Sequence, residues 1–221
     1  MVTDSYLATL QMGIYGLATV GWDYHSAPDA KVVWGAKVAP DGVTDLIFRG
    51  SSEEIDWLRD FDFIALPLDH GKLGPVHAGF FMDMESVLLE VQHNTKAPRR
   101  VGGHSLGAGR ATDLTALLVQ AGEAPLQRVV WGEPLSGCAE QCAIVSKVPA
   151  RSYRNTVGSS HDPVTDAPPF TLTFHHYQRA CALTNVCQPP VDPNWHGLGL
   201  NNALALHNMA LYAMAMQRMW N

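Results

Sequence analysis

The segment Gly103-His104-Ser105-Leu106-Gly107 matches the pattern G-x-S-x-G, which can present a serine hydroxyl as a nucleophile. In serine hydrolases this pattern forms a sharp turn from a strand to a helix, and the turn exposes the hydroxyl. Small residues are needed two positions on either side because the serine backbone is strained there. The N-terminal amide groups of the following helix favour developing negative charge. The pattern is weak by itself, but here it opens a strongly periodic helix, as such a turn requires.

A nucleophilic serine needs a base and an orienting acid, and two later residues have suitable positions. His207 falls at the predicted start of the last helix, where a single histidine is more often a hydrogen-bonded core residue than a base. Asp162 follows a predicted strand, where a single aspartate is more often part of a turn. With Ser105 they follow the chain order Ser, Asp, His that is expected of α/β hydrolases. The combination predicts a catalytic triad, with Asp166 as a rival for the acid.

Helices and strands alternate along the chain around these residues. Apolar residues at helical spacing predict helices near 7–17, 81–91, 106–122 and 203–219. Short segments bounded by turn residues predict strands at 31–38, 43–48, 128–131 and 152–157. The turn between the first two strands, Pro40-Asp41-Gly42, is typical of a hairpin. This alternation predicts a mixed sheet with helices on both faces, in a single α/β domain over residues 1–221.

Length and composition exclude several classes of protein. The chain has 221 residues, of which 47% are hydrophobic and 16% charged, so it can bury a core without disulfides or metals. The net charge of −6 argues against nucleic acid or anionic lipid as a partner. The apolar stretch from Met12 to Trp22 is too short to span a bilayer, and no basic residue precedes Lys31 as a secretory signal would require. We therefore expect a soluble protein, either intracellular or secreted and already processed, whose oligomeric state the sequence leaves open.

The cysteines and the remaining histidines do not predict a metal site. The four cysteines fall in two local pairs, C-x3-C from Cys138 and C-x5-C from Cys181, and neither spacing is common in zinc sites. Structural or free thiols are favoured over a disulfide between Cys181 and Cys187. The two adjacent histidines that begin at His175 would point to opposite faces of a strand, so they cannot easily chelate one ion. We expect neither a metal nor another cofactor.

Several segments carry motifs that occur together in one family. They match an R-G-[ST] oxyanion loop, a V-H-x-G-F segment, a G-H-S-L-G-A turn, a G-x-P strand end and a D-x-V-x-x-x-P-P acid loop. These segments are Arg49-Gly50-Ser51, Val76 to Phe80, Gly103 to Ala108, Gly132-Glu133-Pro134 and Asp162-Pro163-Val164 followed by Pro168-Pro169. With this set the chain resembles the class 3 (fungal-type) triacylglycerol lipases of the α/β-hydrolase superfamily, over residues from about 30 to 212.

The resemblance implies an α/β-hydrolase fold and a role for each matched residue. Ser105 would be the nucleophile, His207 the general base and then the acid, and Asp162 the group that orients His207. The backbone N–H groups of Leu106 and Ser51 would form the oxyanion hole, to which the hydroxyl of Ser51 could add a bond. The rival acid falls four residues late in the family pattern.

Two parts of the sequence depart from the family or leave its properties open. Residues 52–63 occupy the place of the lid, where Ile55, Trp57 and Leu58 could form an apolar face toward substrate. A fixed surface helix is the alternative. A short or immobile lid would favour small soluble esters over emulsified fat. Gly102 stands where an apolar strand residue is usual, and we expect it to loosen the strand before the turn.

These observations predict a serine carboxylic-ester hydrolase. It would work through an acyl-enzyme on short- to medium-chain esters or acylglycerols, without a cofactor. An acyltransferase, a thioesterase or a peptidase could use the same triad. Outside the enzymes, the alternative is a catalytically silent module that binds a lipid or a peptide. The expected partner is a lipid or small-molecule ester, with at most transient contact with a lipid interface.

Overall fold

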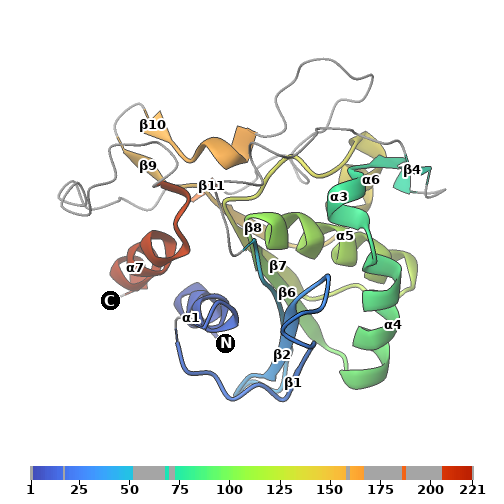
Figure 1. The fold of residues 1–221 in the computed structure, drawn as a ribbon, viewed down its shortest axis with the longest axis horizontal. Helices are drawn as coiled ribbons and strands as arrows, with labels where there is room; N and C mark the ends of the chain where they lie inside the picture. Colours follow the sequence, from blue (N-terminus) through green and yellow to red (C-terminus); the bar gives the residue numbers. More distant parts are fainter. Residues whose placement is uncertain are drawn as a thin grey trace.

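A mixed β-sheet runs through the centre of the computed structural model, with helices on both of its faces (Figure 1). The structure describes residues 2–16, 18–51, 68–69, 73–157, 160–166, 186–187 and 206–220. Within these residues, seven strands form the sheet in the order β1-β2-β3-β6-β7-β8-β11. Their bounds are Tyr24–His25 for β1, Trp34–Val38 for β2, Thr44–Phe48 for β3, Arg99–His104 for β6, Gln127–Trp131 for β7, Ala150–Tyr153 for β8 and Val186–Cys187 for β11.

The sheet changes from antiparallel to parallel pairing at β3. Strands β1, β2 and β3 pair antiparallel, whereas the pairs from β3 through β6, β7 and β8 to β11 are parallel. The hairpin between β2 and β3 turns at Gly42, whose φ of 78° favours glycine. The predicted hairpin is confirmed, although its first strand begins at Trp34 rather than at Lys31. Parallel strands end at a common edge of the sheet, which is where ligands bind in folds of this kind.

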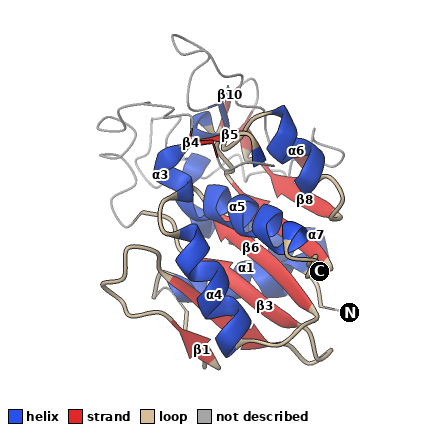
Figure 2. Cartoon of the chain, turned by 90° about the vertical axis from the view of Figure 1, so that its right-hand side faces the viewer, coloured by secondary structure: helices blue, strands red, loops and turns tan. Residues whose placement is uncertain are grey.

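Figures 1 and 2 show the helices on the two faces of the sheet from two directions. Helices α1 and α7 lie side by side on one face, and α3, α4, α5 and α6 lie on the other. This arrangement confirms the predicted mixed sheet with helices on both faces. All six residues of β6 are buried, as expected for a parallel strand that is covered on both sides. The bounds are Asp4–Ile14 for α1, Ala78–Phe81 for α3, Met84–Asn94 for α4, Leu106–Gln120 for α5, Ala139–Val145 for α6 and Met209–Trp220 for α7.

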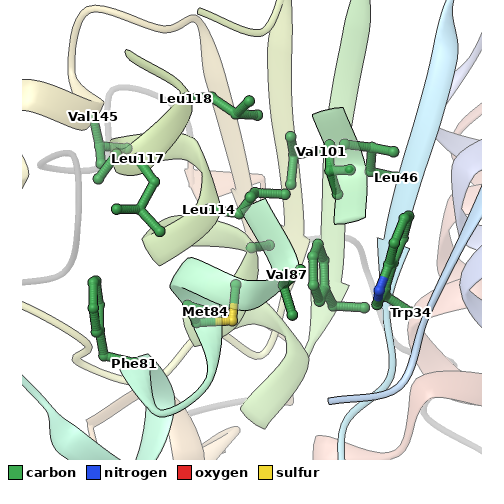
Figure 3. Close-up of a cluster of buried hydrophobic side chains, with 14 of the residues drawn as sticks. Trp34, Leu46, Phe81, Met84, Val87, Val101, Leu114, Leu117, Leu118 and Val145 are labelled. Carbon is green, nitrogen blue, oxygen red and sulfur yellow. The ribbon is translucent and has the colours of Figure 1, made fainter. Parts of the chain in front are cut away.

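A continuous apolar core fixes α5 on the sheet (Figure 3). Leu114 of α5 lies against the side of the sheet that carries Val101 of β6 and Leu46 of β3, and all three side chains are buried. Burying a side chain of this size contributes roughly 1.5–3 kcal/mol relative to leaving it exposed. On the other face, a second cluster that includes Leu10 of α1 and Met216 of α7 holds those two helices together. The first cluster therefore holds α5 against the sheet, and the second holds α1 and α7 against its other face.

Two predicted elements are each divided in the structure. The helix predicted near 81–91 is the pair α3 and α4, because Asp83 between them has a φ of 64°, outside the helical region. The strand predicted at 152–157 ends as β8 at Tyr153. A short strand β9 follows and pairs with β10 instead of joining the central sheet. The short strands outside the sheet are Leu68–Asp69 for β4, Pro75–Val76 for β5, Thr156–Val157 for β9 and Ser160–His161 for β10.

The last helix begins later than predicted. It starts at Met209, and residues 206–207 form a short 3-10 turn before it. The side chain of Asn208 accepts the Ala210 N–H at 2.8 Å, a bond typical of a residue that caps a helix N-terminus. His207 therefore lies in the turn before the helix and not in its first turn. None of the helices in the described ranges is long and apolar enough to cross a membrane.

The expectation that Gly102 loosens its strand was wrong. Strand β6 is paired along its length with β3 on one side and with β7 on the other. A Cβ at Gly102 would lie 3.0 Å from Ile47 Cδ1 and 3.1 Å from the carbonyl oxygen of Val129. These neighbours already occupy the space that a larger side chain would fill. The strand that leads to Ser105 is therefore continuous and tightly packed.

Candidate active site

Ser105 lies in the turn between β6 and α5 and has a strained backbone, with φ 59° and ψ −130°. The turn brings backbone segments so close together that neither flanking glycine has room for a side chain. A Cβ on Gly103 would meet the backbone of Gly107, and a Cβ on Gly107 would meet the backbone of Phe48 at the end of β3. Because α5 begins at the next residue, its first N–H groups lack intrahelical partners. The structure therefore contains the predicted turn.

His207 and Asp162 form a buried pair. Asp162 precedes the 3-10 turn η2, Pro163–Asp166, and its Oδ2 lies 2.8 Å from His207 Nδ1. The same oxygen accepts the hydroxyl of Tyr212 at 2.6 Å, and Oδ1 accepts the Val164 N–H at 2.9 Å. Burial alone would raise the pKa of Asp162, but nearby His207 and the bonds from His207 and Tyr212 hold that pKa below its ordinary value. The acid is therefore an ionised carboxylate.

The bond to Asp162 determines which nitrogen of His207 can act as a base. An ionised carboxylate only accepts hydrogen bonds, so Nδ1 carries the hydrogen and donates it. In the neutral form of the ring, Nε2 has a lone pair that can accept a proton. This nitrogen is buried and has no hydrogen-bond partner among the described residues, and the same holds for Ser105 Oγ.

Gly132 brings the serine turn next to the histidine and the acid. The Ser105 N–H donates to the carbonyl of Trp131 at 3.1 Å, which ties the turn to the residue before Gly132. A Cβ on Gly132 would lie 2.7 Å from His207 Cε1 and 2.8 Å from Asp162 Oδ2. The structure therefore brings all three residues of the predicted triad to one place, at the C-terminal ends of β6 and β7.

His104 supports His207 from the neighbouring position in the turn. The two rings are stacked with their centroids 4.6 Å apart, and His104 Nε2 lies 2.7 Å from the carbonyl oxygen of His207. On its other side, His104 Nδ1 lies 2.9 Å from the hydroxyl of Tyr15. Burial and the nearby His207 lower the pKa of His104 to about 3, so this ring is neutral. His104 therefore packs beside His207 as a neutral ring.

The two predicted oxyanion donors, Ser51 and Leu106, both belong to segments next to Ser105. Leu106 is the first residue of α5, and Ser51 follows Gly50 after the end of β3. A Cβ on Gly50 would lie only 3.0 Å from Ser105 Cβ, so the segment that leads to Ser51 passes directly by the serine. The N–H groups of Ser51 and Leu106 have no hydrogen-bond acceptor within the part of the chain that the structure describes. The predicted lid residues Ile55, Trp57 and Leu58 lie outside that part.

Comparison with protein families identifies the chain. Residues 46–172, more than half of the chain, match the family model described as Lipase (class 3). The chain belongs to the class 3 lipases. It is therefore a serine hydrolase of the lipase and esterase type, as the resemblance implied. A comparison with curated proteins gives no match.

Solved structures of fungal lipases have a similar fold. The triacylglyceride lipase of Rhizomucor miehei matches with 19% identity and a TM-score of 0.60, over 75% of this chain and 73% of that one. A structure described as a triacylglycerol lipase whose catalytic centre is a serine protease triad matches with 20% identity and a TM-score of 0.60, with the same coverage. Lipase II from Rhizopus niveus matches with 20% identity and a TM-score of 0.55, over 67% and 60% of the two chains. These matches show the α/β-hydrolase fold of this class 3 lipase.

In this class 3 lipase Asp166, the rival candidate for the acid, is bonded to Arg154 and His161 and not to His207. Asp166 Oδ2 lies 3.0 Å from a guanidinium nitrogen of Arg154 and 2.5 Å from His161 Nε2. All three groups are at least partly exposed. The ring of His161, the residue before Asp162, is therefore bonded to Asp166. Asp162 and not Asp166 is the carboxylate that reaches His207.

The remaining predictions on thiols and metals are tested only in part. Cys138 and Cys142 are buried, and neither is in a disulfide within the described residues. The histidine pair that begins at His175 and one member of the second cysteine pair, Cys181, lie outside the described residues. Within the described ranges, no group of three or more histidine, cysteine or acidic side chains could hold a metal ion.

Sequence reasoning missed the two tyrosines of this class 3 lipase that bond to the site. Tyr15 lies 35 residues before its partner Gly50 and 89 before His104, and Tyr212 lies 50 residues after Asp162. Bonds over such separations leave no local pattern. Tyr212 alone gives a faint signal, since it is a polar side chain on the apolar face of the last helix that also carries Met216.

Proposed function

We propose that this class 3 lipase hydrolyses carboxylic esters with Ser105 as the nucleophile. Ser105 Oγ attacks the carbonyl carbon while His207 Nε2 takes the hydroxyl proton, and Asp162 stabilises the resulting imidazolium. The tetrahedral intermediate expels the alcohol, which receives the proton from His207, and leaves an acyl-enzyme. A water molecule then repeats the sequence, releases the acid and restores Ser105. The observation that carries this proposal is the buried Asp162–His207 hydrogen bond beside the strained turn of Ser105.

The same proposal assigns the oxyanion hole to Ser51 and Leu106. Their N–H groups belong to the segment that passes Ser105 and to the first turn of α5, so they can converge on one oxygen. The negative end of the developing C–O⁻ bond also meets the positive end of the α5 dipole. Losing one such donor typically costs about 3 kcal/mol of transition-state stabilisation.

Replacement of the nucleophile tests this proposal. For Ser105→Ala we expect kcat on p-nitrophenyl butyrate to fall by about 10⁶-fold, as in other serine hydrolases that lose a triad member. Ser136→Ala is a matched control, because Ser136 is another fully buried serine whose hydroxyl has no partner among the described residues. Circular dichroism should show that both variants fold. A folded Ser105→Ala variant that keeps its activity would defeat the proposal.

We further propose that the substrates are esters of short to medium acyl chains, including acylglycerols. Two relatives of similar fold are described as triacylglycerol or triacylglyceride lipases, and one structure of a fungal lipase is described as a model for interfacial activation. These descriptions support a lipid ester and transient contact with a lipid interface. The test is a series of p-nitrophenyl esters from two to sixteen carbons, measured below and above the aggregation limit of each ester. A maximum at sixteen carbons with a rate jump at aggregation would contradict the short-chain preference.

A further inference from the structure

The phenol of Tyr15, at the C-terminal end of α1, connects two parts of the site that are distant in sequence. Its hydroxyl accepts the Gly50 N–H at 2.9 Å and lies 2.9 Å from His104 Nδ1. His104 Nε2 lies 2.7 Å from the carbonyl oxygen of His207. Three consecutive hydrogen bonds therefore join the oxyanion loop, which we define as Arg49–Ser51, to the backbone of the proposed base.

The chemistry of the partners fixes the direction of these bonds. A carbonyl oxygen only accepts, so His104 Nε2 carries the hydrogen and donates it to His207. The neutral ring of His104 has no hydrogen on Nδ1, which must accept from the Tyr15 hydroxyl. The phenol oxygen then uses a lone pair to accept from Gly50. In this series of three hydrogen bonds every donor faces an acceptor, and only this one assignment of the hydrogens satisfies all three bonds.

The bond from Gly50 to Tyr15 also determines which N–H is left for an oxyanion. The Gly50 N–H is already used, while that of Ser51, the next residue, has no acceptor among the described residues. Only the two dihedral angles of Gly50 separate these N–H groups, and glycine has the widest range of both. The hydrogen bond from the Gly50 N–H to Tyr15 and the close approach of Gly50 to Ser105 restrict the range of these two angles.

We propose that Tyr15 is a positioning residue for the oxyanion hole, whose hydroxyl holds the oxyanion loop so that the Ser51 N–H is aimed at the oxygen of the tetrahedral intermediate. Through His104, the same hydroxyl couples that loop to the backbone of His207. This inference rests on the proposed function, because it takes Ser51 as an oxyanion donor. The phenol acts through the loop, so its removal affects the transition state, in which the oxyanion forms, more than substrate binding.

Tyr15→Phe tests the inference because it removes the hydroxyl and keeps the ring. We expect kcat for p-nitrophenyl butyrate to fall by about tenfold to 100-fold, somewhat less than the 10²–10³-fold typical for loss of an oxyanion donor. KM should change by less than about twofold, since ground-state binding is retained. Tyr6→Phe is the matched control, because Tyr6 lies in the same helix and its hydroxyl has no hydrogen-bond partner among the described residues.

A second readout separates positioning from a general structural effect. A trifluoromethyl ketone with the same acyl chain adds to the serine and forms a tetrahedral oxyanion adduct. If the oxyanion loop is misaligned, the affinity for this ketone should fall by the same factor as kcat/KM. A variant that is only less stable would keep that affinity at temperatures where it is folded.

Three outcomes would overturn the inference. The first is a folded Tyr15→Phe variant with the kcat of the natural chain, and the second is a rise in KM with kcat unchanged. If Tyr15→Phe fails to fold, His104→Gln tests the same series of hydrogen bonds. The amide nitrogen of glutamine can replace Nε2 as the donor to His207, but glutamine has no polar atom at the place of Nδ1 to accept from Tyr15. We expect a smaller loss of kcat in the same direction, and an unchanged kcat is the third overturning result. An active Ser105→Ala variant would defeat the proposed function instead, so the two failures are distinguishable.

Discussion

Gly132→Ala perturbs the His207–Asp162 pair without changing any residue that reacts. A Cβ at this position would lie 2.7 Å from His207 Cε1, 2.8 Å from His207 Nδ1 and 2.8 Å from Asp162 Oδ2. Ordinary van der Waals contact begins at about 3.4 Å. The imidazole and the carboxylate must therefore be displaced by several tenths of an ångström, away from their present hydrogen-bond geometry.

The expected magnitude has a catalytic and a structural part. A misplacement near 1 Å can cost about 100-fold in rate, so we expect kcat/KM to fall by roughly 30- to 100-fold, or about 2–3 kcal/mol of transition-state stabilisation. Gly132 also has a φ of 56°, where a residue with a Cβ costs roughly 1–2 kcal/mol. The free energy of unfolding should fall by at least that amount.

Gly122→Ala is the matched control for this experiment. Gly122 has a φ of 77°, but nothing lies within 4 Å of the position of its Cβ. It should lose a similar roughly 1–2 kcal/mol of stability from backbone strain, with no change in kcat/KM. The assay is hydrolysis of p-nitrophenyl butyrate beside urea unfolding of both variants. Full activity of Gly132→Ala, or equal losses of activity in the two variants, would refute the reasoning.

The remaining predictions concern the acid and the dependence of stability on pH. Asp162→Asn should lower kcat by about 10⁴-fold, because the amide stabilises the wrong tautomer of the histidine. Asp166→Asn removes a charge bonded to Arg154 and should leave kcat within about twofold of the natural chain. A larger loss of kcat for Asp166→Asn than for Asp162→Asn would contradict the assignment of Asp162 as the acid. The pKa of His104 is lowered to about 3 from 6.5, so between these values the unfolded chain binds a proton that the folded protein does not, and stability is lost as pH falls. Between pH 7 and pH 5 this histidine should lower the free energy of unfolding by about 2 kcal/mol. In urea unfolding, the loss of stability between these pH values should be smaller by that amount for His104→Gln than for the natural chain.

The turn at Ser105 could be predicted because most of its constraints are local. A side chain at either glycine around Ser105 would collide with backbone, which lies within five residues for Gly103 and at the end of β3 for Gly107. Both positions therefore require glycine, and the G-x-S-x-G pattern can be recognised in the sequence. The alternation of apolar runs likewise predicted the sheet and its two helical layers, since burial of one face decides each element.

Other features could not be predicted, for physical reasons. The last helix was placed too early because apolar periodicity cannot show that His207 must leave the helix to reach Asp162. The Asn208 cap was the available signal for the true start. The bonds of Tyr15 and Tyr212 depend on how α1 and α7 pack across the sheet, which no local pattern encodes.

Mapping the site of covalent labelling tests the central claim most directly. The natural chain would be reacted with a fluorophosphonate, and its intact mass and digested peptides would be measured beside its remaining esterase activity. We predict one adduct per chain, on the peptide that contains Ser105, with activity lost in proportion to labelling. An adduct on another residue, or full activity after complete labelling of Ser105, would contradict the account.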